Sequence, residues 1–119
     1  MYVRYQGTYN SRRTGKPCGI FAVVSHMKEK GLITPQEREE IQHIVDWFEE
    51  HLPNPPFYKE DPLPKAITWF KQATSAQMLA KIERIKAIVE TYGWQIDTEC
   101  HREVPGPVIY EDDYQIATL

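Results

Sequence analysis

Residues Thr34 to Leu52 read TPQEREEIQHIVDWFEEHL, and this stretch predicts the helix that the rest of the chain must cover. Thr34 suits the N-cap, Pro35 suits the first helical position, and Glu37 completes a T-x-x-E capping box. The apolar residues recur with helical spacing and form one stripe: Ile41, Ile44, Val45, Phe48 and Leu52. Pro53 ends the helix because it has no amide hydrogen to donate. A helix of this kind is stable when its apolar stripe packs against other elements.

Two further helices are predicted on either side of this one. The first has Pro17 in its first turn, is apolar on nearly every side, and ends at Gly31 in a Schellman-type motif. Because only Leu32 and Ile33 separate it from the Thr34 cap, the two helices are expected to form an αα-hairpin. The last helix opens at a second capping box, Thr74-Ser75-Ala76-Gln77, has one apolar face, and closes at Gly93.

Strands are predicted at both ends of the chain. Residues 2–9 alternate, with Val3 and Tyr5 facing inward and Arg4 facing outward. After the last helix the apolar period changes from 3.6 to 2, and three strands are predicted over residues 94–101, 108–111 and 114–117. Residues 66–70, AITWF, fit either a short strand or a helical turn.

The element order is β-α-α-α-β-β-β, which predicts an α+β fold with three helices packed on one face of a small, mostly antiparallel sheet. A chain of 119 residues is expected to form a single domain over residues 1–119. No stretch is long and apolar enough to cross a membrane, and no signal peptide is recognisable. Two cysteines form no zinc pattern and no disulfide framework, so we expect them to be reduced, in the cytoplasm.

The net charge of -3 is unevenly distributed along the chain. The first 28 residues carry +5 and no acidic residue, so the remaining 91 carry -8. The five bases are Arg4, Arg12, Arg13, Lys16 and Lys28. This asymmetry favours an anionic partner at the N-terminal end, and the alternative is that the basic segment lies against the protein's own acidic helices.

The strongest candidate site follows from the position of these bases. Arg12, Arg13 and Lys16 lie in a loop that leads into the predicted helix N-terminus at Pro17, where unpaired amides and the helix dipole favour anions. Arginine matches phosphate geometry, and nearby tyrosines can stack on a base. The predicted site for a phosphate-bearing ligand, either a nucleotide or a nucleic acid, comprises Arg4, Tyr5, Tyr9, Arg12, Arg13 and Lys16. It is not a Walker A loop, since Lys16 is followed by proline, and no cofactor is predicted.

A small enzyme is an alternative. Cys18, in the first turn of a predicted helix beside basic residues, is a candidate nucleophile with a lowered pKa, and His26 is one of four histidines that can serve as its base. Glu111, with the neighbouring Asp112 and Asp113, is a candidate carboxylate base. The competing interpretations are a small buried cysteine and a solvated acidic turn. No histidine spacing matches a metal site, so no metal is predicted.

A protein-interaction or inhibitor module is the other alternative. It would use the acidic helices or the proline-rich segment 53–64, in which Phe57 and Tyr58 are framed by prolines. A homodimer formed through exposed strand edges is also consistent with a small sheet. The sequence therefore leaves a binding protein, an interaction module and an enzyme open, in that order of preference.

Overall fold

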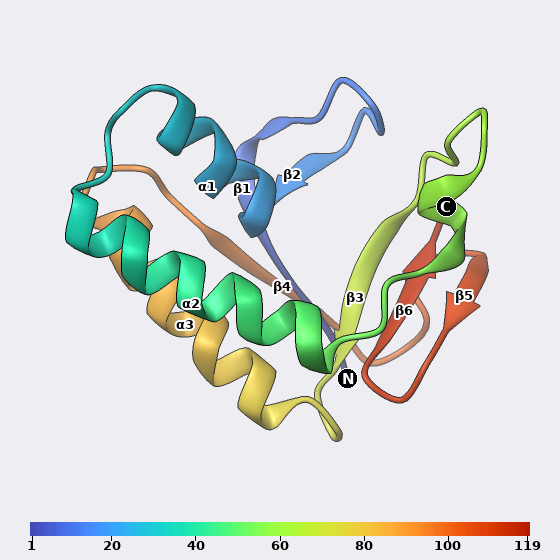
Figure 1. The fold of residues 1–119 in the computed structure, drawn as a ribbon. Helices are drawn as coiled ribbons and strands as arrows, with labels where there is room; N and C mark the ends of the chain where they lie inside the picture. The colour runs from blue at the N-terminus through green and yellow to red at the C-terminus, as the bar shows by residue number, and fades with distance from the viewer.

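The computed structural model describes all 119 residues and has an α+β fold, in which three helices pack against an antiparallel sheet of six strands (Figure 1). The helices are α1 Ile20–Glu29, α2 Pro35–His51 and α3 Ala76–Glu90, with a short 3-10 helix at Pro56–Lys59. The strands are β1 Tyr2–Asn10, β2 Pro17–Gly19, β3 Ile67–Lys71, β4 Asp97–His101, β5 Val108–Glu111 and β6 Gln115–Thr118. The predicted fold class is confirmed, and residues 67–71 form a strand.

The sheet divides in two along one edge of β1. On one side, β1 pairs with β4 from Tyr2 to Gln6. On the other side, its first residues pair with β3 and its last residues, from Gln6 to Asn10, pair with β2. β3 continues through β6 to the edge strand β5, away from β2 (Figure 1). The sheet is therefore open between β2 and β3, beside Arg4 and Tyr5 of β1.

The core lies between the helices and β1. Val3 and Tyr5 are buried there, as their alternation predicted. The stripe of α2 is also confirmed, since Ile41, Ile44 and Phe48 are buried. The Thr34 capping box is present, with reciprocal hydrogen bonds between its side chain and backbone groups and those of Glu37. None of the three helices combines the length and the apolar character needed to span a membrane.

The start of α1 differs from the prediction. Pro17, Cys18 and Gly19 form β2 instead of a first helical turn, because they pair with the end of β1. The helix begins at Ile20, and its N-cap Gly19 has no side chain to accept a hydrogen bond. The end of α1 is as expected, since Gly31 has a φ of +67° and the amide of Leu32 donates to the carbonyl of Met27.

One other local prediction is wrong, and the packing of α2 involves more than the expected partner. The hydroxyls of Thr74 and Ser75 accept no hydrogen bond from the first turn of α3, and they donate instead to the carbonyls of Asp113 and Tyr114 in the β5–β6 turn. In addition, α2 packs more extensively against α3 than against α1 (Figure 1). The start of α1 contacts the end of α2, where the rings of Phe21 and Phe48 meet edge to face.

Candidate functional site

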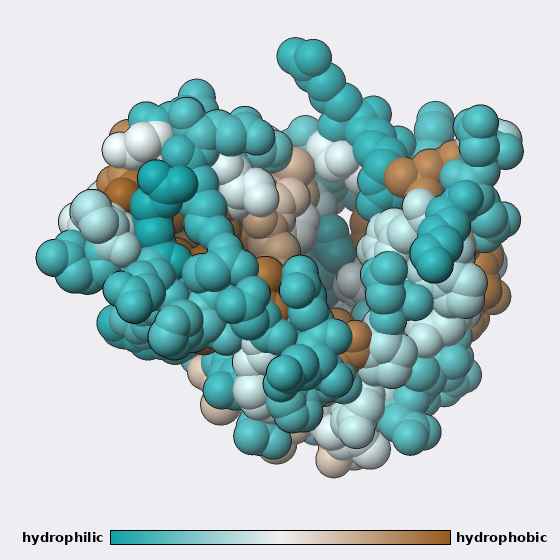
Figure 2. Space-filling view, in the orientation of Figure 1, coloured by the Kyte–Doolittle hydropathy of each residue, from teal (hydrophilic) through white to brown (hydrophobic).

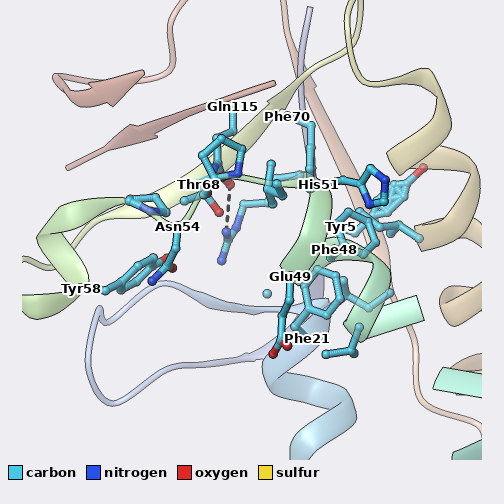
Figure 3. Close-up of a pocket in the computed structure, with 18 of the residues that line it drawn as sticks. Tyr5, Phe21, Phe48, Glu49, His51, Asn54, Tyr58, Thr68, Phe70 and Gln115 are labelled. Atoms are coloured by element: carbon cyan, nitrogen blue, oxygen red, sulfur yellow. Dashed lines mark hydrogen bonds between the residues drawn. The ribbon is translucent and has the colours of Figure 1, made fainter. Parts of the chain in front are cut away.

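The main cavity of the protein, about 810 Å³, occupies the opening between β2 and β3. Its walls come from the start of α1, the last turn of α2, the segment 52–58 and β3 (Figure 3). Figure 2 shows it as a hollow in the middle of one face, with hydrophobic residues on its walls. Sites for small molecules typically have volumes of about 300–1,000 Å³, so this cavity is of the right size.

Aromatic side chains form the apolar part of the cavity. Phe48 lies between Phe21 and Phe70, with ring centroids 5.2 Å and 6.2 Å away. Tyr58 lies on the opposite wall, beside Asn54 (Figure 3). These rings come from α1, α2, β3 and the proline-rich segment, so only the tertiary fold brings them together.

Arg4 lies where the sheet opens, and its guanidinium bridges the two diverging strands. Nη1 donates to the carbonyl of Thr68 in β3 at 3.1 Å, a bond drawn as a dashed line in Figure 3. Nη2 donates to the carbonyl of Pro17 in β2 at 2.9 Å. Nε donates to Oε1 of Gln6 at 3.2 Å. The side chain therefore supplies hydrogen bonds where the two strands do not pair with each other.

No carboxylate lies within ion-pair distance of Arg4, although Glu99 acts on its charge from farther away. Arg4 is only 8% exposed, and it belongs to none of the three ion pairs, which are Lys71–Glu111, Arg84–Glu40 and His101–Glu99. Burial lowers the pKa of Arg4, but an arginine stays protonated at neutral pH. A guanidinium has five N–H donors, and three of those of Arg4 have protein acceptors. The other two donors have no acceptor within the protein.

Gln6 connects Arg4 to a carboxylate farther along the sheet. The Gln6 amide donates from Nε2 to Oε2 of Glu99 at 2.9 Å, so its oxygen is turned toward Arg4. The other oxygen of Glu99 lies 3.1 Å from Nε2 of His101. This chain of contacts holds Arg4 in one orientation, while the carboxylate itself stays outside hydrogen-bonding distance of the guanidinium.

The structure divides the predicted anion site. Arg4 and Tyr5 line the main cavity, and the Tyr5 hydroxyl donates to Glu83 at 2.6 Å. Tyr9, Arg12 and Arg13 line a smaller cavity of about 410 Å³, while Lys16 lines neither. The two groups therefore do not form one site, and the helix N-terminus that was expected to join them begins three residues later.

Arg13 has a structural contact of its own. Its two Nη atoms donate to the carbonyls of Pro64 at 2.8 Å and Ala66 at 3.3 Å, so the β1–β2 loop is attached to the segment that leads into β3. Arg12 is exposed and makes no side-chain hydrogen bond or ion pair within the protein. Of the predicted bases in this loop, Arg12 is thus the one most available to a partner.

Cys18 does not have the environment that the enzyme hypothesis required. It lies in a strand, is 4% exposed, and burial raises the pKa of its thiol, with a smaller opposing effect from Arg4. His26, which lines the smaller cavity with it, has its Nδ1 2.6 Å from the hydroxyl of Tyr9. The predicted lowering of the Cys18 pKa is therefore wrong, because the effect of burial on the thiol outweighs that of the nearby Arg4.

The acidic turn has bonding partners within the protein. Glu111 pairs with Lys71 at 2.5 Å. Asp112 accepts hydrogen bonds from the Tyr110 hydroxyl and from the amides of Tyr114 and Gln115. These contacts hold the β5–β6 turn and do not involve Arg4. No three potential ligands gather as a metal site would require.

Several residues of the cavity were assigned other roles from the sequence. Phe48 was predicted in the apolar stripe of the helix over residues 34–52, Phe70 in a short strand or helical turn, and Tyr58 in the proline-rich segment of the interaction-module alternative. Their helical or strand patterns contain no sign of a cavity, because the opening arises from the way β2 and β3 diverge. Comparison of the chain with protein-family models, curated proteins and solved structures found no match.

Proposed function

We propose that this protein binds a small molecule whose anionic group, a phosphate or a carboxylate, is held by Arg4 in the main cavity. The observation that carries the proposal is a buried guanidinium without a counter-ion in the wall of a cavity of ligand size. We propose a binding protein and not an enzyme, because no activated nucleophile or base lies beside Arg4.

Buried charges in proteins are normally paired, because an isolated charge loses its hydration without compensation. The carbonyls of Thr68 and Pro17 offset part of this loss, but they carry only partial charges. An anion that reached the two remaining donors would supply the missing charge. Because the other three donors are already fixed, the guanidinium would lose little freedom on binding.

The predicted phosphate-bearing ligand is therefore retained, but at a different place. The proposal moves the anion site from the basic loop to Arg4 and Tyr5, which belonged to the predicted set. Nucleic acid binding by Arg12 and Lys16 remains an alternative. A protein partner, a homodimer through the edge strand β5, where Val108 and Ile109 are exposed, and location in the cytoplasm also remain predictions.

Gly19 offers a direct test, because a side chain at this position would reach the guanidinium. A Cβ built on Gly19 would lie 3.5 Å from Nη2 of Arg4, in ordinary van der Waals contact. The backbone, with φ of -66° and ψ of 159°, accepts any residue. Gly19→Asp would thus place an internal carboxylate where the ligand anion is proposed to bind, and Gly19→Asn would place a neutral group of the same shape there.

Calorimetric titration would compare the parent with both variants, using phenyl phosphate, AMP and N-acetyl-L-phenylalanine as probes. At least one probe is expected to bind the parent, and to bind Gly19→Asp about tenfold more weakly than Gly19→Asn, because two anions then compete for one cation. Arg12→Ala is the control and is expected to bind like the parent. Failure of every probe to bind, or equal binding by the Asp and Asn variants, would contradict the proposal. Loss of binding in Arg12→Ala alone would return the site to the basic loop.

A further inference from the structure

We infer that the ligand of the main cavity is a zwitterion, with its anionic group on Arg4 and its cationic group at the C-terminal end of α2. The inference rests on the proposed function and adds the class of the ligand. It starts from the charges around the cavity, where a single cation, Arg4, is accompanied by two carboxylates, Glu49 and Glu50.

The two carboxylates lie on the wall formed by the last turn of α2. Both are exposed, and neither forms an ion pair within the protein. Figure 3 shows the Glu49 carboxylate on the side of the cavity away from Thr68, near Phe21. A cationic group in the cavity would therefore meet carboxylates that have no other partner.

The end of α2 adds to this negative potential. The last carbonyls of a helix lack intrahelical partners and form the negative end of its dipole. The cap satisfies one of them, since the Leu52 amide donates to the Phe48 carbonyl at 2.8 Å. His51, the basic residue of the last turn, has its Nδ1 2.7 Å from the Trp47 carbonyl and stacks on the Trp47 ring. Its ring is thus directed back along the helix and does not cancel the charge of the two glutamates.

This distribution of charge favours some classes of ligand over others. A phosphate with nearly two negative charges would gain from Arg4 but would be repelled by the two glutamates and the helix end. A carboxylate alone would satisfy Arg4 and leave the opposite wall without a partner. A molecule with one charge of each sign would satisfy both walls and enter the cavity without net charge.

The middle of the cavity limits the rest of the molecule. The same cavity is lined by the rings of Phe21, Phe48 and Phe70, which favour an apolar or aromatic body. The volume of about 810 Å³ accommodates an aromatic amino acid and leaves room for a second residue. We therefore place amino acids and short peptides with apolar side chains first among the candidates.

The test uses pairs of probes that differ in one charge. L-phenylalanine and L-phenylalanyl-L-phenylalanine carry both charges, their N-acetyl forms carry only the carboxylate, L-phenylalaninamide carries only the ammonium, and phenyl phosphate serves as the anion of higher charge. Dissociation constants would be measured for the parent, for the double variant Glu49→Gln/Glu50→Gln and for Glu39→Gln. Glu39 is an exposed carboxylate of α2 that does not line the cavity, so it is the matched control.

At least one free amino compound is expected to bind the parent about fivefold or more tightly than its N-acetyl form and than phenyl phosphate. The double variant should remove this preference, and Glu39→Gln should keep it. Equal or tighter binding of an N-acetyl probe or of phenyl phosphate would overturn the zwitterion and leave the Arg4 site intact. A preference that survives in the double variant would also overturn it. If no probe binds, the inference and the proposed function both fail.

Discussion

Arg4 has hydrogen bonds to the carbonyls of two strands that do not pair with each other, and it lines the cavity that separates them. The same side chain therefore contributes to the fold and to the proposed site. Replacing Arg4 itself would change both, which is why Gly19, whose Cβ would contact the guanidinium without being part of its hydrogen bonds, separates the two contributions.

The first prediction concerns stability without ligand. Gly19→Asp is expected to raise the free energy of unfolding by about 1–2 kcal/mol, because the carboxylate pairs with a buried cation and also caps α1, whose present N-cap has no side chain. Gly19→Asn provides the cap alone and should gain only a few tenths of a kcal/mol. Urea unfolding of the three proteins measures the difference. Equal stability of the Asp and Asn variants would show that Arg4 does not need a counter-ion.

The second prediction concerns Gln6, which accepts the Nε hydrogen bond of Arg4 and donates to Glu99. Gln6→Leu removes both contacts and is expected to lower the free energy of unfolding by about 1–3 kcal/mol, because the Nε donor stays buried without an acceptor. It should also weaken probe binding, since the guanidinium is then less well oriented. Gln95→Leu is the control, because Gln95 is exposed and its amide binds only Asp97. Equal losses in the two variants would contradict a positioning role.

Local alternation predicted correctly which way Val3, Tyr5 and Arg4 point, but it gave no sign that Arg4 is buried. All three follow the same period of two, so the two apolar residues face the helices and Arg4 lies on the other side of β1. Arg4 was expected to face outward there, and it is buried because β2 and β3 flank it. The burial of Arg4 depends on strand residues that lie 13 and 64 positions away in the sequence, and no short sequence pattern encodes their proximity.

Among the elements, the boundaries set by local hydrogen bonds were predicted best. The Thr34 cap of α2 and the Gly31 ending of α1 need only neighbouring residues, and both are present. Thr74 and Ser75 have the same sequence pattern as a cap, but their hydroxyls donate to the β5–β6 turn, about 39 residues away. These two hydroxyls are oriented by a carbonyl acceptor in the tertiary structure, and not by the N–H donors at the start of α3.

The third prediction concerns this β5–β6 turn. Burial alone would raise the pKa of Asp112, but the hydrogen bonds from Tyr110, Tyr114 and Gln115 outweigh it and lower the pKa below 3.8. The hydrogen bond to Asp112, followed by burial, raises the pKa of Tyr110 to about 12. The Asp112 contribution to stability is therefore present above pH 3.8 and is lost as the pH falls through the lowered pKa. The Tyr110 contribution is present below pH 10.0 and is lost as the pH rises through about 12.

Asp112→Ala is accordingly expected to lower the free energy of unfolding by roughly 1 kcal/mol at pH 7, since these groups are largely solvent-screened. The difference from the parent should shrink when unfolding is measured below pH 3.8. Asp113→Ala is the control, because the Asp113 side chain is exposed and only its backbone carbonyl accepts a hydrogen bond. A difference that stays constant down to pH 2 would show that ionisation of Asp112 does not stabilise the turn.

For the molecule as a whole, the cavity is a consequence of topology. One strand, β1, has two partners at opposite ends of the same edge, and these partners carry the start of α1 and the proline-rich segment apart from each other (Figure 1). Residues of α1 and α2 line the opening, and Arg4 bridges β2 and β3 across it. The three-helix and sheet content could be predicted from periodicity, whereas the division of the sheet depends on which strands pair, and this is not visible in any single segment.

The fourth prediction uses this arrangement to separate the two possible anion sites. A ligand held by one buried guanidinium is shielded from salt, so the dissociation constant of N-acetyl-L-phenylalanine should change less than about twofold between about 50 and 200 mM salt. Binding of a single-stranded oligonucleotide by three bases of the exposed loop, Arg12, Arg13 and Lys16, would release counter-ions. Its affinity should fall by roughly 20-fold over the same range. Titrations of both probes at the two salt concentrations make the comparison, with Arg12→Ala as the loop control. If the dissociation constant of N-acetyl-L-phenylalanine depends strongly on salt and this dependence is lost in Arg12→Ala, anion binding takes place on the loop. Arg4 is then only a structural bridge between β2 and β3.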